Sequence, residues 1–423
     1  MELPETLDGW LSLLELRHGQ SIQLGLDRVR TVKDALTCPQ TCPVFTVGGT
    51  NGKGSTCALL EAVLLAAGYR VGVYTSPHLL RYNERVRING REATDEVLVH
   101  AFAEVERVRG DVPLTYFEHG TLAAWVAFSR AGLDAIILEV GLGGRLDAVN
   151  VFEPDCAIVT SVAMDHMDYL GDTRDAIGFE KAGIFRAGRP AICADPMPPA
   201  SLLSYAEAIG AKLWVSGRDF GFTGDQNQWA FWIAGGSRRG GLAYPALRGA
   251  NQLLNAAAVM AACEAVRRLL PVPMQAIRQG FMLVDLPGRF QVMPGRPTVV
   301  LDVAHNPQAA GVLNENLASM GFFPETWAVL GMLADKDVPG VVRLLRDRVD
   351  HWAVASLPGP RGLTARALGG ILRECGVDKD IAECSSPGEA YALVRKQAAE
   401  GDRIVVFGSF LTVADVLAAR KTP

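Results

Sequence analysis

The sequence predicts an α/β fold in two domains, each built on a largely parallel sheet. Apolar runs alternate with helical stretches over most of the 423 residues. These runs are nearly continuous, without regular polar interruptions, which is typical of buried parallel strands. The length favours two domains, because one hydrophobic core seldom serves more than about 250–300 residues. A segment rich in Gly and Pro, residues 285–297, separates two series of such elements.

The first series opens with a strand, a glycine-rich turn and a helix. The strands expected in this series are 43–49, 69–76, 134–140, 156–162 and 190–194. The helices expected in it are 53–67, 119–131, 251–269 and 273–284. Residues 213–247 carry Gly and Trp in short stretches, and they predict a small antiparallel excursion from the βα alternation.

A second α/β series follows the Gly- and Pro-rich segment. Its expected strands are 298–304, 327–333, 351–356 and 403–409. The predicted organisation is therefore a first domain of residues 1–288, a linker of residues 289–297 and a second domain of residues 298–423.

The composition is that of an ordinary globular protein. Hydrophobic residues make up 49% and charged residues 21%, and the net charge is −5. This charge gives no reason to expect binding to nucleic acid or to an anionic membrane. No apolar run reaches the roughly 18 residues of a membrane span, and the acidic N-terminus does not resemble a signal peptide. We expect a cytoplasmic protein whose eight scattered cysteines are free thiols.

A phosphate-binding loop is the clearest local motif. The stretch VGGTNGKGST, residues 47–56, follows an apolar strand and opens a helix, where backbone N–H groups and the helix dipole favour an anion. Glycines let the backbone approach phosphate oxygens, and Lys53 can reach the outer phosphates. The fit to the Walker pattern is imperfect, because Gly54 follows the lysine and the hydroxyl comes one residue later; a purely structural turn is the alternative. The residues expected to contact ATP here are Thr50, Asn51, Gly52, Lys53, Gly54 and Ser55.

Eight short motifs occur in one order along the chain. They are GTNGKGS (49–55), TSPHL (75–79), YNERVRING (82–90), LEVGLGGRLDAVN (138–150), MDHMDYLG (164–171), EKAGIF (180–185), PGRFQ (287–291) and DVAHNP (302–307). Together they resemble the folylpolyglutamate synthases of the Mur ligase superfamily, from about Leu11 to near the C-terminus. The family also places its lysine as Lys53 is placed here. The resemblance implies a P-loop ATP-binding N-terminal domain and a smaller Rossmann-like C-terminal domain.

The resemblance also implies a reaction. ATP phosphorylates a carboxylate, and the amine of L-glutamate displaces phosphate to form an amide. In bifunctional members the carboxylate belongs to dihydropteroate or to the glutamate tail of a reduced folate. A monofunctional folylpolyglutamate synthase is the nearest alternative. A peptidoglycan-precursor ligase fits less well, since only 40-odd residues precede the loop, and a nucleotide-dependent switch with slow hydrolysis is a further alternative.

Three residues are implied as magnesium ligands, and one lysine as a modified residue. Glu139 ends an apolar strand, at the edge where α/β proteins bind ligands. By resemblance Ser76, Glu139 and His166 ligate magnesium, and Lys181 carries a carbamate.

 Two magnesium sites are expected. From the residues alone, Glu139 could be a surface group at a strand end, His166 a loop histidine, Ser76 a turn former and Lys181 a surface lysine. The expected catalytic residues are Lys53, Lys181 and His166. His166 is thus expected to be both a metal ligand and a catalytic residue.

Further contacts to ATP are implied outside the loop. The residues concerned are Asn255, Arg289, Asp302 and His305. Asn255 belongs to a helix rich in small residues, which allows close packing. Arg289 lies in the expected linker and could instead face water, and His305 begins a helix and could lie near ATP or near glutamate.

The pterin side of the substrate is expected at three segments. The residues are Gln23, Leu24, Gly25, Thr115, Tyr116, Phe117, Glu118, Leu146, Asp147 and Ala148. Tyr116 and Phe117 could stack on a flat ring, or they could be core aromatics ahead of a helix. Gln23 stands where some relatives carry an acidic residue. The expected partners are dihydropteroate, reduced folates and L-glutamate, and the expected assembly is a monomer.

Overall fold

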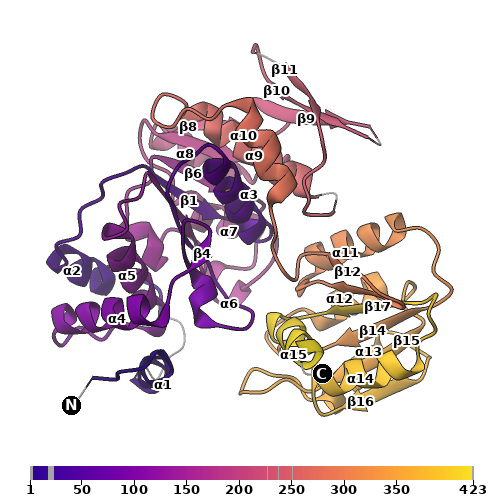
Figure 1. Ribbon diagram of the computed structural model, residues 1–423. Helices are drawn as coiled ribbons and strands as arrows, with labels where there is room; N and C mark the ends of the chain where they lie inside the picture. Colours follow the sequence, from indigo (N-terminus) through magenta and orange to yellow (C-terminus); the bar gives the residue numbers. More distant parts are fainter. Residues whose placement is uncertain (1–2, 18–22, 226, 237, 250, 422–423) are drawn as a thin grey trace. The chain divides into compact units, whose positions relative to one another are not determined.

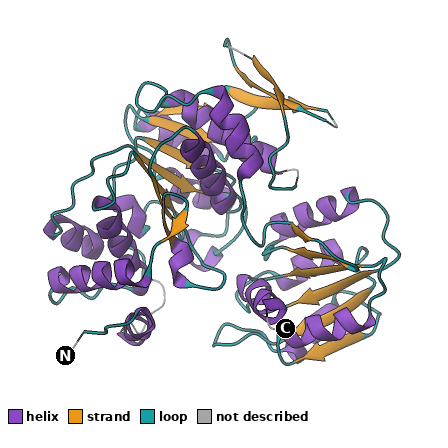
Figure 2. Ribbon diagram, viewed as in Figure 1, coloured by secondary structure: helices purple, strands orange, loops and turns teal. Residues whose placement is uncertain are grey.

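The structure is a computed structural model that describes residues 3–17, 23–225, 227–236, 238–249 and 251–421. The chain forms two compact units. The first consists of residues 1–246 and 253–284, and the second of residues 247–252 and 285–423. Each unit has its own largely parallel sheet (Figures 1 and 2). Each also has its own hydrophobic core. The domain limits expected from the sequence are not tested by this division and remain predictions.

The sheet of the first unit has eight strands in the order β4-β3-β2-β5-β1-β6-β7-β8. Its strands are β1 (Val44–Gly48), β2 (Val71–Tyr74), β3 (Val86–Ile88), β4 (Arg91–Glu92), β5 (Ala135–Glu139), β6 (Cys156–Val159), β7 (Pro190–Cys193) and β8 (Lys212–Val215). Neighbouring strands pair in parallel along the series β2, β5, β1, β6, β7 and β8. The short strands β3 and β4 pair antiparallel and form one edge of the sheet. Every residue of β1, β2, β5 and β6 is buried, which explains their continuous apolar sequences.

Helices cover both faces of this sheet (Figure 1). They are α1 (Leu7–Arg17), α2 (Asp27–Ala35), α3 (Lys53–Ala66), α4 (Asp95–Arg109), α5 (Tyr116–Ser129), α6 (Met167–Leu170), α7 (Arg174–Ala182), α8 (Ala200–Ala208), α9 (Asn251–Ala265) and α10 (Met274–Leu283), with the 3₁₀ turns η1 (Tyr82–Arg85) and η2 (Ala148–Val151). Helix α10 packs closely on α3, because a Cβ at Gly280 would lie 2.6 Å from the backbone of Val63. The glycine therefore sets the distance between these two helices.

The expected antiparallel excursion is confirmed. Strands β9 (Phe220–Gly224), β10 (Trp229–Ile233) and β11 (Arg238–Leu242) form a separate sheet in the order β11-β10-β9. Both pairings in this sheet are antiparallel. Trp229 attaches it to the unit, since its buried ring lies 6.0 Å from the ring of Phe281 in α10.

The sheet of the second unit has six strands in the order β12-β13-β17-β14-β15-β16. The strands are β12 (Gln291–Met293), β13 (Thr298–Leu301), β14 (Thr326–Leu330), β15 (His351–Ala355), β16 (Ile381–Cys384) and β17 (Arg403–Phe407). The helices are α11 (Pro307–Ser319), α12 (Val338–Leu345), α13 (Ala365–Glu374), α14 (Pro387–Gln397) and α15 (Phe410–Lys421). All strands but β12 pair in parallel.

Two details differ from the sequence expectations. The segment expected as a linker contains β12, which pairs antiparallel with β13. An edge strand needs hydrogen bonds on one side only, so the flanking glycines and prolines do not prevent it. Helix α5 begins at Tyr116, three residues earlier than expected, because Thr115 and Glu118 cap each other reciprocally.

The α/β class and the parallel sheets are confirmed. All eight cysteines are free thiols, also as expected. Within the described residues, no helix has the length and the apolar character needed to cross a membrane.

Candidate active site

The phosphate-binding loop follows β1 and leads into α3. Gly49 has φ +141°, and a Cβ there would lie 1.9 Å from Thr160 Oγ1. Gly52 has φ +87° and is the N-cap of α3, where no side chain caps the helix. Both positions require glycine, because one needs close approach and both need a positive φ. The first turn of α3 thus presents its N–H groups at the carboxyl edge of the sheet.

The segment after β6 holds this loop in place. The backbone N–H of Thr50 donates to Ser161 O at 2.7 Å, and that of Asn51 donates to Ser161 Oγ at 3.1 Å. Thr160 Oγ1 donates to Asn51 O at 2.6 Å. The sequence reasoning missed Thr160 and Ser161, although both end an expected strand beside the loop. These bonds fix the loop from outside, so its shape does not depend on a ligand.

Lys53 and Asn255 both lie against the loop. Lys53 Nζ donates to Gly49 O at 3.1 Å and to Thr50 O at 3.2 Å. A Cβ on Gly52 would lie 2.7 Å from Asn255 Oδ1, so the buried Asn255 of α9 contacts the loop at its N-cap glycine. The structure thus brings together the loop and the residue expected to contact ATP from α9.

Ser76 and Glu139 meet at the ends of neighbouring strands. Glu139 is the last residue of β5 and is 4% exposed. Its Oε2 accepts a hydrogen bond from the Ser76 N–H at 3.2 Å. A buried carboxylate beside a hydroxyl residue supplies the oxygen ligands that magnesium prefers. These two residues therefore fit a hard divalent cation.

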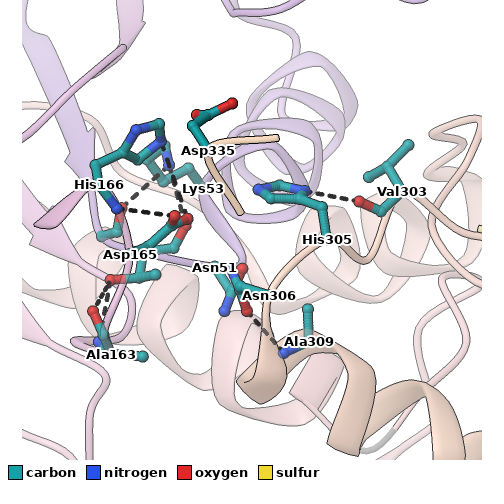
Figure 3. A network of polar contacts seen from close by, with 12 residues as sticks. Asn51, Lys53, Ala163, Asp165, His166, Val303, His305, Asn306, Ala309 and Asp335 are labelled. Carbon is teal, nitrogen blue, oxygen red and sulfur yellow. Dashed lines mark hydrogen bonds and ion pairs between the residues drawn. The ribbon is translucent and has the colours of Figure 1, made fainter. Parts of the chain in front are cut away.

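His166 stands at the start of α6 with φ +51°. Its backbone N–H donates to Asp165 Oδ1 at 2.9 Å, and its Nε2 lies 3.9 Å from Asp165 Oδ2 (Figure 3). The imidazole is 29% exposed. Among the described residues, no group of three or more His, Cys, Asp or Glu side chains has a geometry that could hold a metal ion. The assignment of His166 as a third ligand therefore remains a prediction.

Lys181 is a buried amine in α7. Its side chain is enclosed, and it belongs to a residue only 3% exposed. Burial, followed by the positive charge of Lys53, lowers the pKa of Lys181 to about 7, while Asp165 and Asp147 oppose the shift. The surface-lysine alternative is wrong. An amine with this pKa is largely uncharged slightly above neutral pH, and an uncharged amine is a nucleophile.

Asp147 lies at the start of η2 and is committed to the local backbone. Its Oδ2 accepts from the Leu142 N–H at 2.8 Å, and its Oδ1 accepts from the Val149 N–H at 3.0 Å. Burial raises the pKa of Asp147 to about 6, against the effect of these hydrogen bonds and of Lys53. The side chain shapes the turn that also contains Leu146 and Ala148.

Two of the three segments expected around the pterin are adjacent. The Gly25 N–H donates to Leu146 O at 3.3 Å, which joins residues 23–25 to residues 146–148. Residues 18–22, directly before this first segment, lie outside the described residues. Leu24 is half-buried and Gln23 is exposed.

Glu118 links the third segment to the first. It is 3% exposed, and Arg28 Nη2 donates to its Oε1 at 2.9 Å and to Gln23 O at 2.9 Å. Its Oε2 accepts from the Thr115 N–H at 2.8 Å. Glu118 therefore has a structural role at the start of α5, whatever it also contacts in a substrate. All three segments of the expected pterin site are connected through it and Gln23.

Tyr116 and Phe117 begin α5 and are partly buried against the core of the first unit. The ring of Phe117 fills the space above Gly141, where a Cβ would lie 2.6 Å from its Cζ. The ring of Tyr116 is within 5.6 Å of the guanidinium carbon of Arg85. Arg85 Nε donates to His78 Nδ1 at 2.8 Å. Sequence reasoning quoted both motifs that contain Arg85 and His78 but gave these residues no role.

In the second unit, Asp302 follows β13 and organises the loop after it. Its Oδ2 accepts from the Phe290 N–H at 2.9 Å, and its Oδ1 accepts from the Ala304 N–H at 2.8 Å. Burial raises the pKa of Asp302 above its usual value, against the effect of these bonds and of Arg289. The carboxylate joins the segment before β12 to the end of β13.

Arg289 and His305 both lie near one aromatic ring, that of Phe410. The guanidinium carbon of Arg289 is 4.8 Å from the ring centroid of Phe410, and the His305 ring centroid is 6.4 Å from it. His305 Nδ1 lies 2.8 Å from Val303 O (Figure 3). The structure thus brings Arg289 and His305 to Phe410, and the Asp302 carboxylate interacts electrostatically with both. Phe410 itself was missed, because an aromatic residue at a helix start carries no distinctive signal.

Comparison with known proteins defines the class of protein first. The family model of the Mur ligase middle domain matches residues 47–219. The family model of the Mur ligase glutamate ligase domain matches residues 288–410. Both regions of a Mur ligase are therefore present, one in each part of the chain that carries a parallel sheet.

Full-length relatives then define the family. The chain is 46% identical over 412 residues to the dihydrofolate synthase/folylpolyglutamate synthase of Escherichia coli K12, which covers 97% of this chain and 94% of that protein. It is similar to the structure of E. coli FolC in complex with DHPP and ADP, with a TM-score of 0.94, 44% identity and full coverage of both chains. A bifunctional synthase with Mn, AMPPNP and L-glutamate bound gives a TM-score of 0.91 at 45% identity, over 99% of this chain and 100% of that one. The chain belongs to the dihydrofolate synthase/folylpolyglutamate synthase family.

Proposed function

We propose that this protein uses ATP to ligate L-glutamate to dihydropteroate, which forms dihydrofolate, and to the glutamate tails of reduced folates. The observation that carries the proposal is the similarity to bifunctional synthases along the whole chain. The site supports the same chemistry, since a fixed phosphate loop, a buried carboxylate and a buried amine belong to one unit.

The reaction has two steps. A carboxylate oxygen of the substrate attacks the γ-phosphorus of ATP, and ADP leaves with the electrons of the broken P–O bond. The amine of glutamate then attacks the carbonyl carbon of the acyl phosphate; the C–O bond breaks, inorganic phosphate leaves and the nitrogen loses a proton. Both steps bring anions together, so the site must supply positive charge.

The chain's own residues supply much of that charge. We assign the phosphates of ATP to the N–H groups from Thr50 to Ser55, with Lys53 leaving the loop carbonyls to reach the outer phosphates. Asn255 supports the loop at Gly52. In the second unit, we assign Arg289, Asp302 and His305 to the nucleotide, with Asp302 acting mainly on the loop that carries the other two.

We assign divalent metal to Ser76, Glu139 and His166. A bound magnesium ion would neutralise the phosphates and the developing charge. Glu139 and Ser76 support this assignment by their mutual contact and by their oxygen atoms, which suit a hard cation. The N–H group of Ser76 orients the Glu139 carboxylate.

Lys181 is the residue we assign to carbamylation. Its neutral amine attacks the carbon of CO₂ and loses a proton, which converts a buried cation into an anion. The lowered pKa supports this step, because only the neutral amine reacts. Native mass spectrometry in bicarbonate should show an added mass of one CO₂ that is lost on acidification and absent from Lys181→Met. An unmodified mass in bicarbonate for the wild-type protein would contradict the assignment.

The pterin is assigned to the three connected segments around Glu118. Tyr116 and Phe117 would supply apolar faces for the ring, and Gly25 and Leu146 the backbone beside it. We expect the enzyme to be a cytoplasmic monomer, which sedimentation analysis of the purified protein can check.

The decisive experiment is product analysis by mass spectrometry. The protein is incubated with ATP, magnesium and glutamate, and with either dihydropteroate or tetrahydrofolate. We expect dihydrofolate from the first substrate and a polyglutamate series from the second. A tetrahydrofolate series without any dihydrofolate would identify a monofunctional folylpolyglutamate synthase instead. Phosphate release that is independent of both substrates would overturn the ligase assignment.

A further inference from the structure

Arg85 is a half-buried cation near the expected pterin site. It ends η1, and its Nε donates to His78 Nδ1 at 2.8 Å. Among the residues described by the structure, no Asp or Glu side chain forms an ion pair with its guanidinium. Because arginine remains protonated, this bond makes His78 a neutral acceptor at Nδ1. Most arginines removed from water are compensated by an anion, and this one is not.

Aromatic rings hold Arg85 without neutralising it. Its guanidinium carbon lies 5.4 Å from the ring centroid of Tyr82 and 5.6 Å from that of Tyr116. Tyr82 is buried, and its ring meets that of Tyr116 edge-on at 6.1 Å. Rings in this arrangement orient a cation and stabilise it modestly, but they leave its net charge in place. The guanidinium is therefore preorganised to receive an anion.

The position of Arg85 connects the two halves of the proposed site. Its carbonyl oxygen accepts a hydrogen bond from the Thr75 N–H at 2.9 Å, one residue before Ser76. Tyr116, on the other side, begins the helix that carries the expected pterin residues. The guanidinium itself contacts Tyr116 and His78, which is two residues after Ser76, so an anion bound by it would lie near both segments.

The tail of a reduced folate carries a carboxylate that dihydropteroate lacks. Dihydropteroate has a single carboxylate, and that carboxylate reacts. A reduced folate ends in glutamate, whose γ-carboxylate is extended while its α-carboxylate takes no part in the chemistry. A site that accepts both substrates must therefore tolerate or bind one additional anion. The planar fork of arginine matches a carboxylate through two parallel hydrogen bonds.

We propose that Arg85, oriented by His78 and held between Tyr82 and Tyr116, binds the non-reacting α-carboxylate of the folate tail. This inference rests on the proposed function and names the residue that separates its two substrates. The charge of the α-carboxylate is the same in the ground state and in the transition state. Its binding therefore lowers KM for the folate and leaves kcat almost unchanged.

The test compares both activities in Arg85→Gln. We expect KM for tetrahydrofolate to rise roughly tenfold to a hundredfold, the range for a lost charge-assisted hydrogen bond, with kcat nearly constant. KM for dihydropteroate should change less than about threefold, well below that range. Arg85→Lys should restore part of the affinity for tetrahydrofolate, since it returns the charge without the planar fork. Arg91→Gln, an exposed arginine on β4, is the matched control and should change neither value.

A substrate analogue makes the assignment specific. Tetrahydropteroyl-4-aminobutyrate keeps the γ-carboxylate and lacks the α-carboxylate, so wild-type protein and Arg85→Gln should use it with equal KM. Equal losses for dihydropteroate and tetrahydrofolate in Arg85→Gln would overturn the inference, as would unchanged values for both. An additional loss on the analogue would overturn it too. The wild-type rates with the two natural substrates test the proposed function independently, so the two failures can be told apart.

Discussion

The two units place a helix after the first parallel strand of their sheets, but they treat the start of that helix differently. In the first unit, β1 leads to α3, whose N-cap is Gly52 and has no side-chain cap. In the second unit, β13 leads to α11, whose N-cap Asn306 accepts a hydrogen bond from the Ala309 N–H at 2.9 Å (Figure 3). One helix start is left for a ligand, and the other is satisfied by its own chain.

We propose that this difference reflects two ways of binding an anion on one type of scaffold. The first unit offers backbone N–H groups, which need glycines and a loop fixed by Thr160 and Ser161. The second unit offers the side chains of Arg289 and His305, mounted on a loop that Asp302 fixes. Backbone recognition suits the phosphates, whereas side-chain recognition can be supplied by a loop without a glycine-rich turn.

The largest effect is expected from Lys53→Ala in the first unit. Lys53 donates to the loop carbonyls of Gly49 and Thr50, so the free energy of unfolding should change by less than about 1 kcal/mol in Lys53→Ala. Ligation should fall by at least about a hundredfold to a thousandfold, because the outer phosphates lose their lysine. Steady-state ligation rates and a urea titration measure the two effects. Lys212→Ala, an exposed lysine in β8, is the control, and retained turnover in Lys53→Ala would defeat the assignment.

Lys181→Met should separate stability from activity in the same unit. The folded-state pKa of Lys181 is lowered to about 7 from 10.5, so between these values the unfolded chain binds more protons and wild-type stability rises with pH. Below pH 7 the folded protein bears the full cost of a buried cation. Methionine removes that cost, and the variant should be more stable by a few kcal/mol at pH 6, with the difference vanishing above about pH 10.5.

Urea titrations of both proteins in CO₂-free buffer, from pH 6 to pH 10, measure this difference. Ligation by Lys181→Met should also fall at every pH, because the carbamate cannot form. A variant that is equally stable at pH 6 would show that Lys181 is not held in the folded protein as a costly cation.

The comparison also shows which features could be predicted from sequence. The phosphate loop could, because its glycines and Lys53 lie within a few residues and each has a local reason. Predicting that distant strand ends meet, as Ser76 and Glu139 do, required the family resemblance. No local pattern specifies a partner 63 residues away. The start of α5 was predicted three residues too late, although Thr115 and Glu118 have the spacing of a capping box. Arg85 was missed because its significance lies in what it lacks, which only the folded structure reveals.

The start of α11 in the second unit, which the Asn306 side chain caps, can be tested in the same way. Asn306→Ala removes the cap of α11 and should lower the free energy of unfolding by about 1 kcal/mol. The matched change in the first unit is Gly52→Ala, whose Cβ would meet Asn255 Oδ1 at 2.7 Å in a backbone conformation with φ +87°. That change should weaken ATP binding, whereas Asn306→Ala should act mainly on stability. Isothermal titration with ATP and thermal unfolding distinguish them, and equal losses of ATP affinity would remove the proposed contrast.

The smallest effect is expected at Phe410, whose ring lies near Arg289 and His305. Phe410→Leu keeps an apolar side chain but removes the ring face on which the Arg289 guanidinium lies at 4.8 Å. A cation–π contact of this kind is worth about 0.5–1 kcal/mol, so KM for ATP should rise about twofold to fivefold with little change in kcat. Phe322→Leu, at an exposed phenylalanine of the same unit, serves as the control. If Phe410→Leu leaves KM for ATP unchanged while Arg289→Ala raises it, the arginine acts without its aromatic support, and the second unit then relies on the Asp302 loop alone to position its cation.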